Sequence, residues 1–295
     1  MAAVAVSSAA MAQVTISGNV DARYETSKSS TAAAAKGFLI SDAQLNFAAT
    51  EDLGGGLKAA AKFTIDGFTS DNSSATTKGD GIDISLAGDF GSVIFSSRDS
   101  SDYLGNDLVT DQLKGSAGGV YNGGVQDRIT YTSPTISGIR FQVTMQDGDI
   151  GTATTHDNKS NLYEIYYANG PISADFGALT TKKSTNADSD GGTRFRVGYN
   201  FGVAAVSYGE INAKDAAGAK DKATAWSVSV PMGAVSLSYA YATIKDAASA
   251  KRDGAAFSAT YALSKRTSLI AQQVNYENAD ITNAKRTRLT MSHSF

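Results

Sequence analysis

Residues 14–25 read VTISGNVDARYE. The even-numbered positions are apolar or small, and the odd-numbered positions carry hydroxyls, amides and charges of both signs. Successive side chains of a β-strand point to opposite faces of the sheet. The alternation therefore predicts a strand with one apolar face and one polar face.

The same period of two recurs along the whole chain, for example in residues 57–66 and 139–146. Such segments are the sequence signature of half-buried strands. We predict about sixteen strands, at residues 14–26, 38–50, 56–68, 80–89, 92–98, 127–134, 139–147, 161–168, 172–181, 192–200, 202–211, 223–231, 234–245, 253–263, 267–276 and 285–295.

The connections between these strands alternate between short and long. Short turns fall at residues 89–91, 169–171, 200–202 and 231–233, and long polar segments at 27–37, 69–79, 148–160, 182–191, 212–222 and 277–284. Outer-membrane barrels have tight turns at one end and long loops at the other, whereas a soluble β-sandwich does not normally keep such an alternation. The sequence therefore predicts one all-β domain over residues 13–295, a closed antiparallel transmembrane β-barrel.

Composition excludes several classes of protein. The chain has 295 residues, a formal net charge of −3 and no cysteine, and its mean hydropathy is −0.18. A nucleic-acid-binding protein would normally be basic, and a chain without cysteine has no disulfides, thiolate metal sites or cysteine nucleophiles. No run of 18 apolar residues predicts a transmembrane helix, but a barrel strand needs only one apolar residue in two.

Residues 1–12 differ from the rest of the chain. They read MAAVAVSSAAMA, a stretch of small and apolar residues that ends in Ala10-Met11-Ala12. This matches the end of a signal peptide with its cleavage site, although the basic region that normally precedes it is missing. We predict a signal-peptide remnant over 1–12, a mature start at Gln13, and export. A short disordered or helical N-terminus is the alternative.

The two faces of the strands carry different side chains. An Arg or Lys directed at the middle of a bilayer costs roughly 2–4 kcal/mol, so the basic residues are expected to face a hydrated lumen. These residues are Arg23, Lys58, Lys62, Arg98, Arg140, Arg194, Arg196, Arg286 and Arg288. The apolar face, expected to meet lipid, includes Phe47, Phe63, Phe95, Tyr131, Tyr163, Tyr167, Phe195, Tyr199, Trp226, Tyr239, Tyr241, Phe257 and Tyr261.

The third long loop is the largest. About 28 residues rich in Asp, Gly and Ser separate the strands near 92–98 and 127–134. A loop of that length in a regular barrel is more often functional than incidental, and disorder is the alternative reading.

Several short motifs are similar to those of Gram-negative general porins, in particular the sixteen-stranded trimeric porins of β-proteobacteria. They are the segments at residues 50–59, 88–93, 131–134 and 261–267, together with the terminal His293-Ser294-Phe295. They extend from the first turn to the last residue. The resemblance implies a homotrimer in the outer membrane, in contact with lipid and lipopolysaccharide, and a barrel-assembly signal at Phe295.

The resemblance also implies that the third loop folds into the lumen and narrows it. Its acidic residues Asp99, Asp102, Asp107 and Asp111 would then oppose the basic wall, with Arg23, Arg98, Arg140, Arg194, Arg196, Arg286 and Arg288 as candidates. Opposed charges across a narrow pore orient polar solutes and set ion selectivity. The expected function is passive diffusion of ions and small hydrophilic solutes, without catalysis or a cofactor. For each of these residues, a solvated surface charge or a strand-to-strand pair is the alternative.

Three other functions compete with this interpretation. An enzyme is disfavoured because the two histidines, His156 and His293, adjoin no evident nucleophile and acid. A substrate-specific barrel channel with a binding site in its pore is the closer alternative, and a surface adhesin is the third. The acidic stretch from Asp66 to Asp83 offers the oxygen ligands that Ca²⁺ prefers, but its composition is equally that of a hydrated loop.

Overall fold

The computed structural model describes residues 13–28, 34–68, 78–98, 126–147, 159–182, 189–215, 220–245, 251–277 and 285–295. These residues form sixteen strands: β1 (Gln13–Lys28), β2 (Ala35–Gly54), β3 (Leu57–Asp66), β4 (Lys78–Gly88), β5 (Gly91–Arg98), β6 (Gln126–Thr132), β7 (Ile139–Asp147), β8 (Lys159–Asn169), β9 (Ile172–Lys182), β10 (Ser189–Asn200), β11 (Ala205–Asp215), β12 (Lys220–Met232), β13 (Val235–Lys245), β14 (Lys251–Ala262), β15 (Thr267–Glu277) and β16 (Lys285–Ser294). No helix in this part of the chain is long and apolar enough to cross a membrane.

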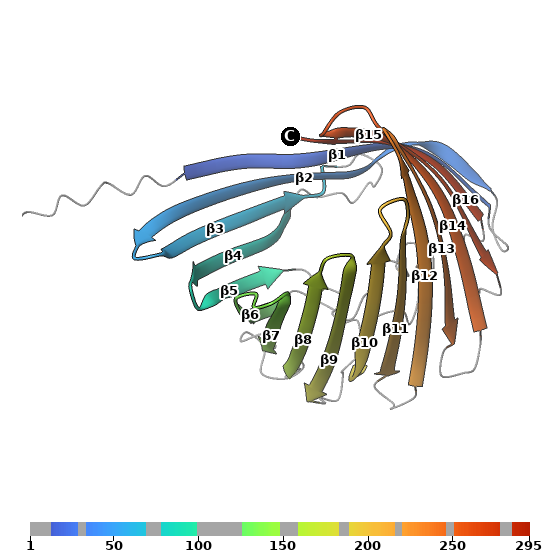
Figure 1. The fold of residues 1–295 in the computed structure, drawn as a ribbon. Helices are drawn as coiled ribbons and strands as arrows, with labels where there is room; N and C mark the ends of the chain where they lie inside the picture. Colours follow the sequence, from blue (N-terminus) through green and yellow to red (C-terminus); the bar gives the residue numbers. More distant parts are fainter. Residues whose placement is uncertain are drawn as a thin grey trace, which may run out of the picture.

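The strands form one closed antiparallel barrel. Each strand pairs with its neighbours in sequence, and β1 pairs with β16 to complete the ring (Figure 1). Closure leaves every strand with a hydrogen-bonded neighbour on both sides, which is what a bilayer demands of a spanning sheet. The predicted fold class is therefore confirmed.

The two ends of the barrel differ, and we call them the turn side and the loop side. On the turn side, the link between β2 and β3 is the glycine run Gly54-Gly55-Gly56, whose φ angles are 80°, 61° and 82°. Only glycine adopts such positive φ values without strain, so the three glycines make this tight turn possible. The loop side carries the longer connections.

The strands on the loop side are longer than the sequence predicts. Residues 212–222 were expected to form a long loop, and this expectation is wrong: β11 continues to Asp215 and β12 begins at Lys220. Lys214 lies directly opposite Lys220 in this extension. Both faces of the ladder are polar there, so the alternation that reveals a strand is lost although the backbone pairing continues.

The C-terminus is part of the ladder. The Phe295 amide donates to the Gly18 carbonyl oxygen, the Gly18 amide donates to the Phe295 carbonyl oxygen, and both distances are 3.0 Å. The last residue thus extends the β1–β16 pairing by one reciprocal pair. Residues 1–12, the predicted signal remnant, lie outside the described residues, and that assignment stays a prediction.

Candidate functional site

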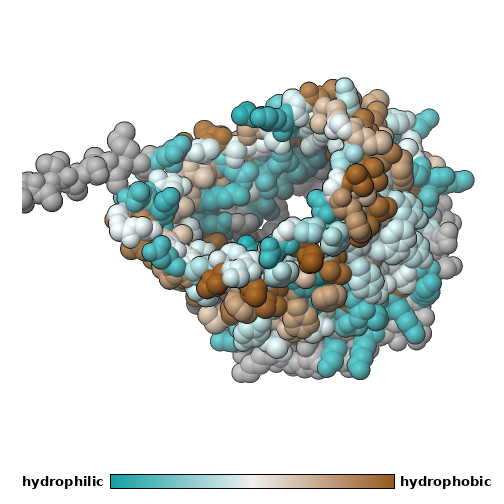
Figure 2. All heavy atoms as spheres, in the orientation of Figure 1, coloured by the Kyte–Doolittle hydropathy of each residue, from teal (hydrophilic) through white to brown (hydrophobic). Residues whose placement is uncertain are grey.

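The register of the strands assigns each side chain to the inside or the outside of the barrel. Directly opposite residues on paired strands share a face. Glu25 lies opposite Arg288, and the neighbouring Tyr24 lies opposite Leu289. Arg288 is only 9% exposed, whereas Leu289 is 54% exposed. Figure 2 shows hydrophilic residues lining the opening and hydrophobic patches on the outer surface, so the face of Glu25 and Arg288 is the inner one.

The outer face carries the aromatic residues predicted to meet lipid. All thirteen lie on the outer side in the register of the strands. Trp226 packs against Tyr239 and Tyr241, with ring centroids 5.4 and 6.3 Å apart. Aromatic rings of this kind form the girdles at the lipid–water boundary of membrane barrels.

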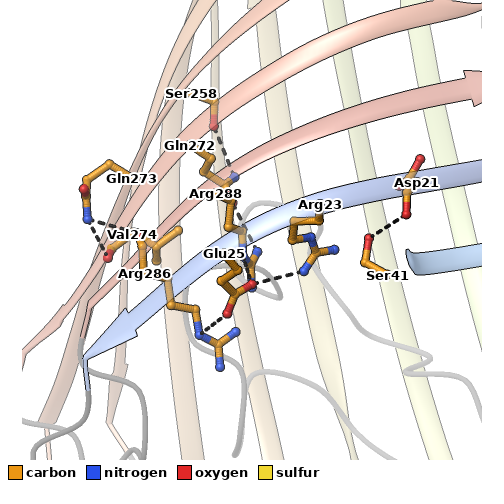
Figure 3. Close-up of polar contacts among 10 residues, drawn as sticks. All are labelled: Asp21, Arg23, Glu25, Ser41, Ser258, Gln272, Gln273, Val274, Arg286 and Arg288. Atoms are coloured by element: carbon orange, nitrogen blue, oxygen red, sulfur yellow. Dashed lines mark hydrogen bonds and ion pairs between the residues drawn. The ribbon is translucent and has the colours of Figure 1, made fainter. Parts of the chain in front are cut away.

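A cluster of three arginines and one carboxylate lies on the inner face where β1 meets β16. We call Arg23, Glu25, Arg286 and Arg288 the Glu25 cluster (Figure 3). Arg288 Nε donates to Glu25 Oε2 at 2.9 Å, and an Arg23 terminal nitrogen lies 3.3 Å from the same oxygen. Arg286 Nε lies 3.8 Å from Glu25 Oε1.

The Glu25 cluster is positively charged and held in place by neutral neighbours. Arg288 also donates to Gln272 Oε1 at 3.2 Å, and Gln272 in turn donates to Ser258 at 3.2 Å. Among the described residues of the cluster, the single carboxylate of Glu25 contacts three guanidinium groups. Counted over these four residues, the cluster carries more positive than negative charge on the inner face.

A second inner cluster spans β8, β9 and β10. We call Glu164, Asp175, Arg194 and Arg196 the Arg194 cluster. Arg194 bonds Glu164 at 2.8 Å and Asp175 at 3.0 Å, and Arg196 bonds the other oxygen of Asp175 at 2.7 Å. The Arg194 side chain is 6% exposed, so this cluster is a buried network of matched charge, in contrast to the Glu25 cluster.

Gly177 allows the contact between Arg194 and Glu164, which crosses a whole intervening strand. Glu164 and Arg194 lie on β8 and β10, and Gly177 of the intervening β9 stands directly opposite both. With no side chain at this position, the Arg194 guanidinium passes over the backbone of β9 to reach Glu164. Gln142 of β7 donates to the second Glu164 oxygen at 2.9 Å and completes the network.

Arg140 belongs to neither cluster. Its guanidinium carbon lies 4.6 Å from the centroid of the Tyr166 ring, a cation–π contact. Its Nε is buried without a hydrogen-bond partner. Within the described residues, no carboxylate pairs with this arginine.

The loop-side half of the inner face of β11–β15 is apolar, which corrects the expectation of polar inward residues there, whereas the turn-side half is rich in serine. The buried residues there share small or aliphatic side chains, and we call them the inner apolar stripe: Ile211, Ala223, Ala225, Ala242, Ile244, Ala256 and Val274. The register joins them in rows, for example Ile211 opposite Ala223 and Ala223 opposite Ile244.

The structure brings together some of the predicted site residues. Arg23, Arg286 and Arg288 meet in one cluster, Arg194 and Arg196 meet in the other, and Arg140 stands apart. Arg98 ends β5, but its side chain lies outside the described residues, as do Asp99, Asp102, Asp107 and Asp111.

The sequence reasoning missed the acidic residues of the wall. Glu25, Glu164 and Asp175 are the partners of the basic residues that it singled out. Their position on the polar face of their strands was the available signal, since Glu25 shares its face with Arg23 two residues away. Within the acidic stretch from Asp66 to Asp83, considered above as a Ca²⁺ site, residues 69–77 lie outside the described residues. The described residues contain no group of three or more possible metal ligands.

Comparison with known proteins gives one family and one fold. A family described as Gram-negative porin matches residues 1–281. The anion-selective porin of Comamonas acidovorans is similar in structure, with a TM-score of 0.78 and 21% identity, over 97% of this chain and 100% of that chain. No curated protein sequence matches the chain.

Two further solved structures share the barrel. Salmonella typhi OmpF, in complex with daunomycin, has a TM-score of 0.72 and 13% identity over 96% of this chain and 97% of its own. A triple mutant of the Rhodopseudomonas blastica porin has a TM-score of 0.69 and 14% identity over 96% and 100%. At these identities the likeness concerns the fold.

Proposed function

We propose that the Glu25 cluster gives the pore of this protein a preference for anions. The chain belongs to the Gram-negative porin family and is a passive, non-enzymatic diffusion channel of the outer membrane. The observation that carries the proposal is the charge of the four described residues of this cluster: three guanidinium groups contact a single carboxylate on the inner face. Charged side chains lining a pore favour the passage of ions of opposite sign.

The similar porin of Comamonas acidovorans is anion-selective, which is consistent with this proposal but concerns another protein. The Arg194 cluster contributes less to selectivity, because its two carboxylates and two guanidinium groups balance each other. Arg140 adds a further positive charge on the wall.

The constriction of the pore is the second part of the proposal. We assign it to the third loop, with Asp99, Asp102, Asp107 and Asp111 facing the basic wall. The inner apolar stripe supports this, because its residues are buried although they point into the barrel. A chain segment of about 28 residues is long enough to cover such a stripe, and packing it there removes apolar surface from water.

The assembly is proposed to be a homotrimer. A hollow of about 660 Å³ on the outer face of β4–β8 supports a protein contact on this side. Its apolar lining includes Ile82, Ile84, Phe95, Ile129 and Met145. A second subunit would fill this hollow with complementary side chains, and lipid chains are the competing occupant.

Lipopolysaccharide is the proposed partner of the loop-side rim, where a row of lysines supports the assignment. Lys222, Lys245 and Lys251 stand directly opposite one another on β12, β13 and β14 and point outwards. Lys222 pairs with Glu210 at 3.0 Å and Lys251 with Asp253 at 3.2 Å, whereas Lys245 has no ion pair within the described residues. Figure 2 shows hydrophilic side chains gathered near this rim, at the lower right. Like charges directly opposite one another are unfavourable, and a lipid phosphate between them would offset this.

The test of anion preference is the reversal potential of single channels in a planar bilayer with a KCl gradient. We expect a chloride-to-potassium permeability ratio above one. The double variant Arg23→Gln/Arg286→Gln should lower this ratio, and Lys245→Gln, on the outer face, is the matched control that should leave it unchanged. A ratio below one in the unmodified protein would refute the proposed sign.

A further inference from the structure

A hollow of about 480 Å³ lies in the wall formed by β7–β11, near the turn side. Arg140, the second residue of β7, lines it, and so do Tyr166 and Arg196. The Glu25 cluster lies towards the other end of the barrel, since Glu25 is three residues from the loop-side end of β1. The hollow is therefore a separate feature of the pore, and we call it the Arg140 hollow.

One edge of the hollow is a row of charged and aromatic residues. Arg140 lies opposite Tyr166, Tyr166 opposite Asp175, and Asp175 opposite Arg196. Neighbouring strands are about 4.8 Å apart, so four strands bring Arg140 and Arg196 to within roughly 15 Å at their backbones. Their side chains extend over this row from its two ends.

The floor of the hollow consists of small residues one step closer to the turn side. Ala168 lies opposite Ser173, Ser173 opposite Gly198, and Gly198 opposite Ser207. A Cβ atom at Gly198 would come within 2.7 Å of Ser173 Oγ, so the absence of a side chain keeps this part of the floor low. The serine hydroxyls give the floor hydrogen-bonding groups.

The charged group of the hollow that is available to a solute is a cation, Arg140. The Asp175 carboxylate is used by Arg194 and Arg196. The Tyr166 ring covers one face of the Arg140 guanidinium, and Nε is buried, so Nε does not face a solute. The two terminal nitrogens of Arg140 form no ion pair within the described residues and are the donors available in the plane of the group. A guanidinium with free in-plane donors matches the two oxygens of a carboxylate.

From this geometry we infer that the Arg140 hollow is a subsite for small hydroxylated carboxylates, such as sugar acids, on the turn side of the constriction. The carboxylate binds Arg140, and the hydroxyl-bearing remainder lies over Ala168 and Gly198 within reach of Ser173 and Ser207. The inference rests on the proposed pore and adds to it a step at which one class of solute is retained briefly during passage. Neutral polyols of the same length lack the group that Arg140 binds.

The experiment uses the complete protein in a planar bilayer, with gluconate as the probe and sorbitol as its uncharged counterpart. We expect gluconate to interrupt the KCl current in a concentration-dependent manner and sorbitol to leave it uninterrupted. Arg140→Gln should raise the apparent dissociation constant for gluconate about 10- to 100-fold, the range for losing a hydrogen bond to a charged group. Arg128→Gln removes the same charge from the inner face of β6 and should change the constant little.

A second variant tests the shape of the hollow without changing its charge. Ala168→Phe should weaken gluconate block by filling the floor, while KCl conductance shows that the barrel is folded. Normal KCl conductance without gluconate block, or block that is equal in Arg140→Gln and Arg128→Gln, would overturn the subsite and leave the pore intact. Absence of KCl conductance in the unmodified protein would overturn the proposed pore and the subsite with it.

Discussion

The ring of Phe295 lies directly over Gly18, so close that a Cβ atom at position 18 would stand 2.6 Å from the ring's Cζ atom. The same Cβ would also come within 2.5 Å of the Gln44 carbonyl oxygen on the neighbouring strand. The junction of β1 and β16 is thus formed by backbone hydrogen bonds and also requires a residue without a side chain at position 18.

Replacing Gly18 should therefore impair closure of the barrel. Gly18→Leu must displace both the terminal ring and the β2 backbone, and overpacking of this kind costs roughly 1–3 kcal/mol or more. The fraction of protein that migrates as a folded, heat-modifiable barrel on electrophoresis should fall. Gly79→Leu is the matched control, since a Cβ at Gly79 meets nothing within 4 Å. Equal folded fractions for the two variants would contradict the prediction.

The Arg194 cluster should contribute strongly to stability. Arg194→Ala leaves Glu164 buried without its charged partner, and breaking a buried pair in this way costs about 3–5 kcal/mol. The exposed Lys222–Glu210 pair provides the comparison, and Lys222→Ala should cost about 1 kcal/mol or less. Urea unfolding in lipid vesicles measures both values, and a similar loss in the two variants would show that burial does not govern the effect.

Removing the carboxylate of the Glu25 cluster should increase anion preference. Glu25→Gln removes the negative charge that contacts Arg23, Arg286 and Arg288, so the chloride-to-potassium permeability ratio should rise. Salt screens charges over about 10 Å at 0.1 M and about 3 Å at 1 M, so the difference from the unmodified protein should shrink at high salt. A difference that is independent of salt would point to a change in pore shape instead.

The proposed third-loop constriction predicts a wider pore when the loop is shortened. Replacing residues 104–119 by a short Gly/Ser linker should raise single-channel conductance. Asp107→Asn keeps the loop length and should change selectivity towards anions with little change in conductance. An unchanged conductance in the shortened variant would place the constriction elsewhere.

The lysine row predicts a contribution of lipopolysaccharide to stability. Lys245→Gln should reduce the increase in thermal midpoint that lipopolysaccharide vesicles give over vesicles of zwitterionic phospholipid. A basic residue near an anionic membrane surface contributes about 1 kcal/mol. Lys58→Gln changes a lysine on the inner face near the turn side and should leave the increase intact.

The number of strands and the face of each side chain could be predicted from the sequence, because both follow from a period of two. The loop-side extensions of β11 and β12 could not, since polar residues on both faces carry no alternation. The inner apolar stripe was missed for a related reason: Ala223 and Ala225 alternate with Thr224 and Trp226, so small residues occupy the face expected to be polar.

The pairing of wall charges also depends on more than the sequence pattern. Glu25 and Arg288 are 263 positions apart, and only the closing register brings them together. Contacts across Gly177 depend on the order of β8, β9 and β10 and on the length of the turns between them. The alternation of residues along a strand identifies which side chains face the pore. The register between strands determines which of these side chains contact one another.

The pairing of β1 with β16 also fixes the timing of assembly. β1 pairs with β16, which follows the other fifteen strands along the chain, so this edge of β1 is covered only after β16 has been synthesised. Until that strand arrives, the first strand has an open edge, and an unfinished chain is an incomplete cylinder that cannot hold water apart from lipid. A chain that lacks β16 therefore cannot close this barrel and is not expected to form a smaller version of the pore.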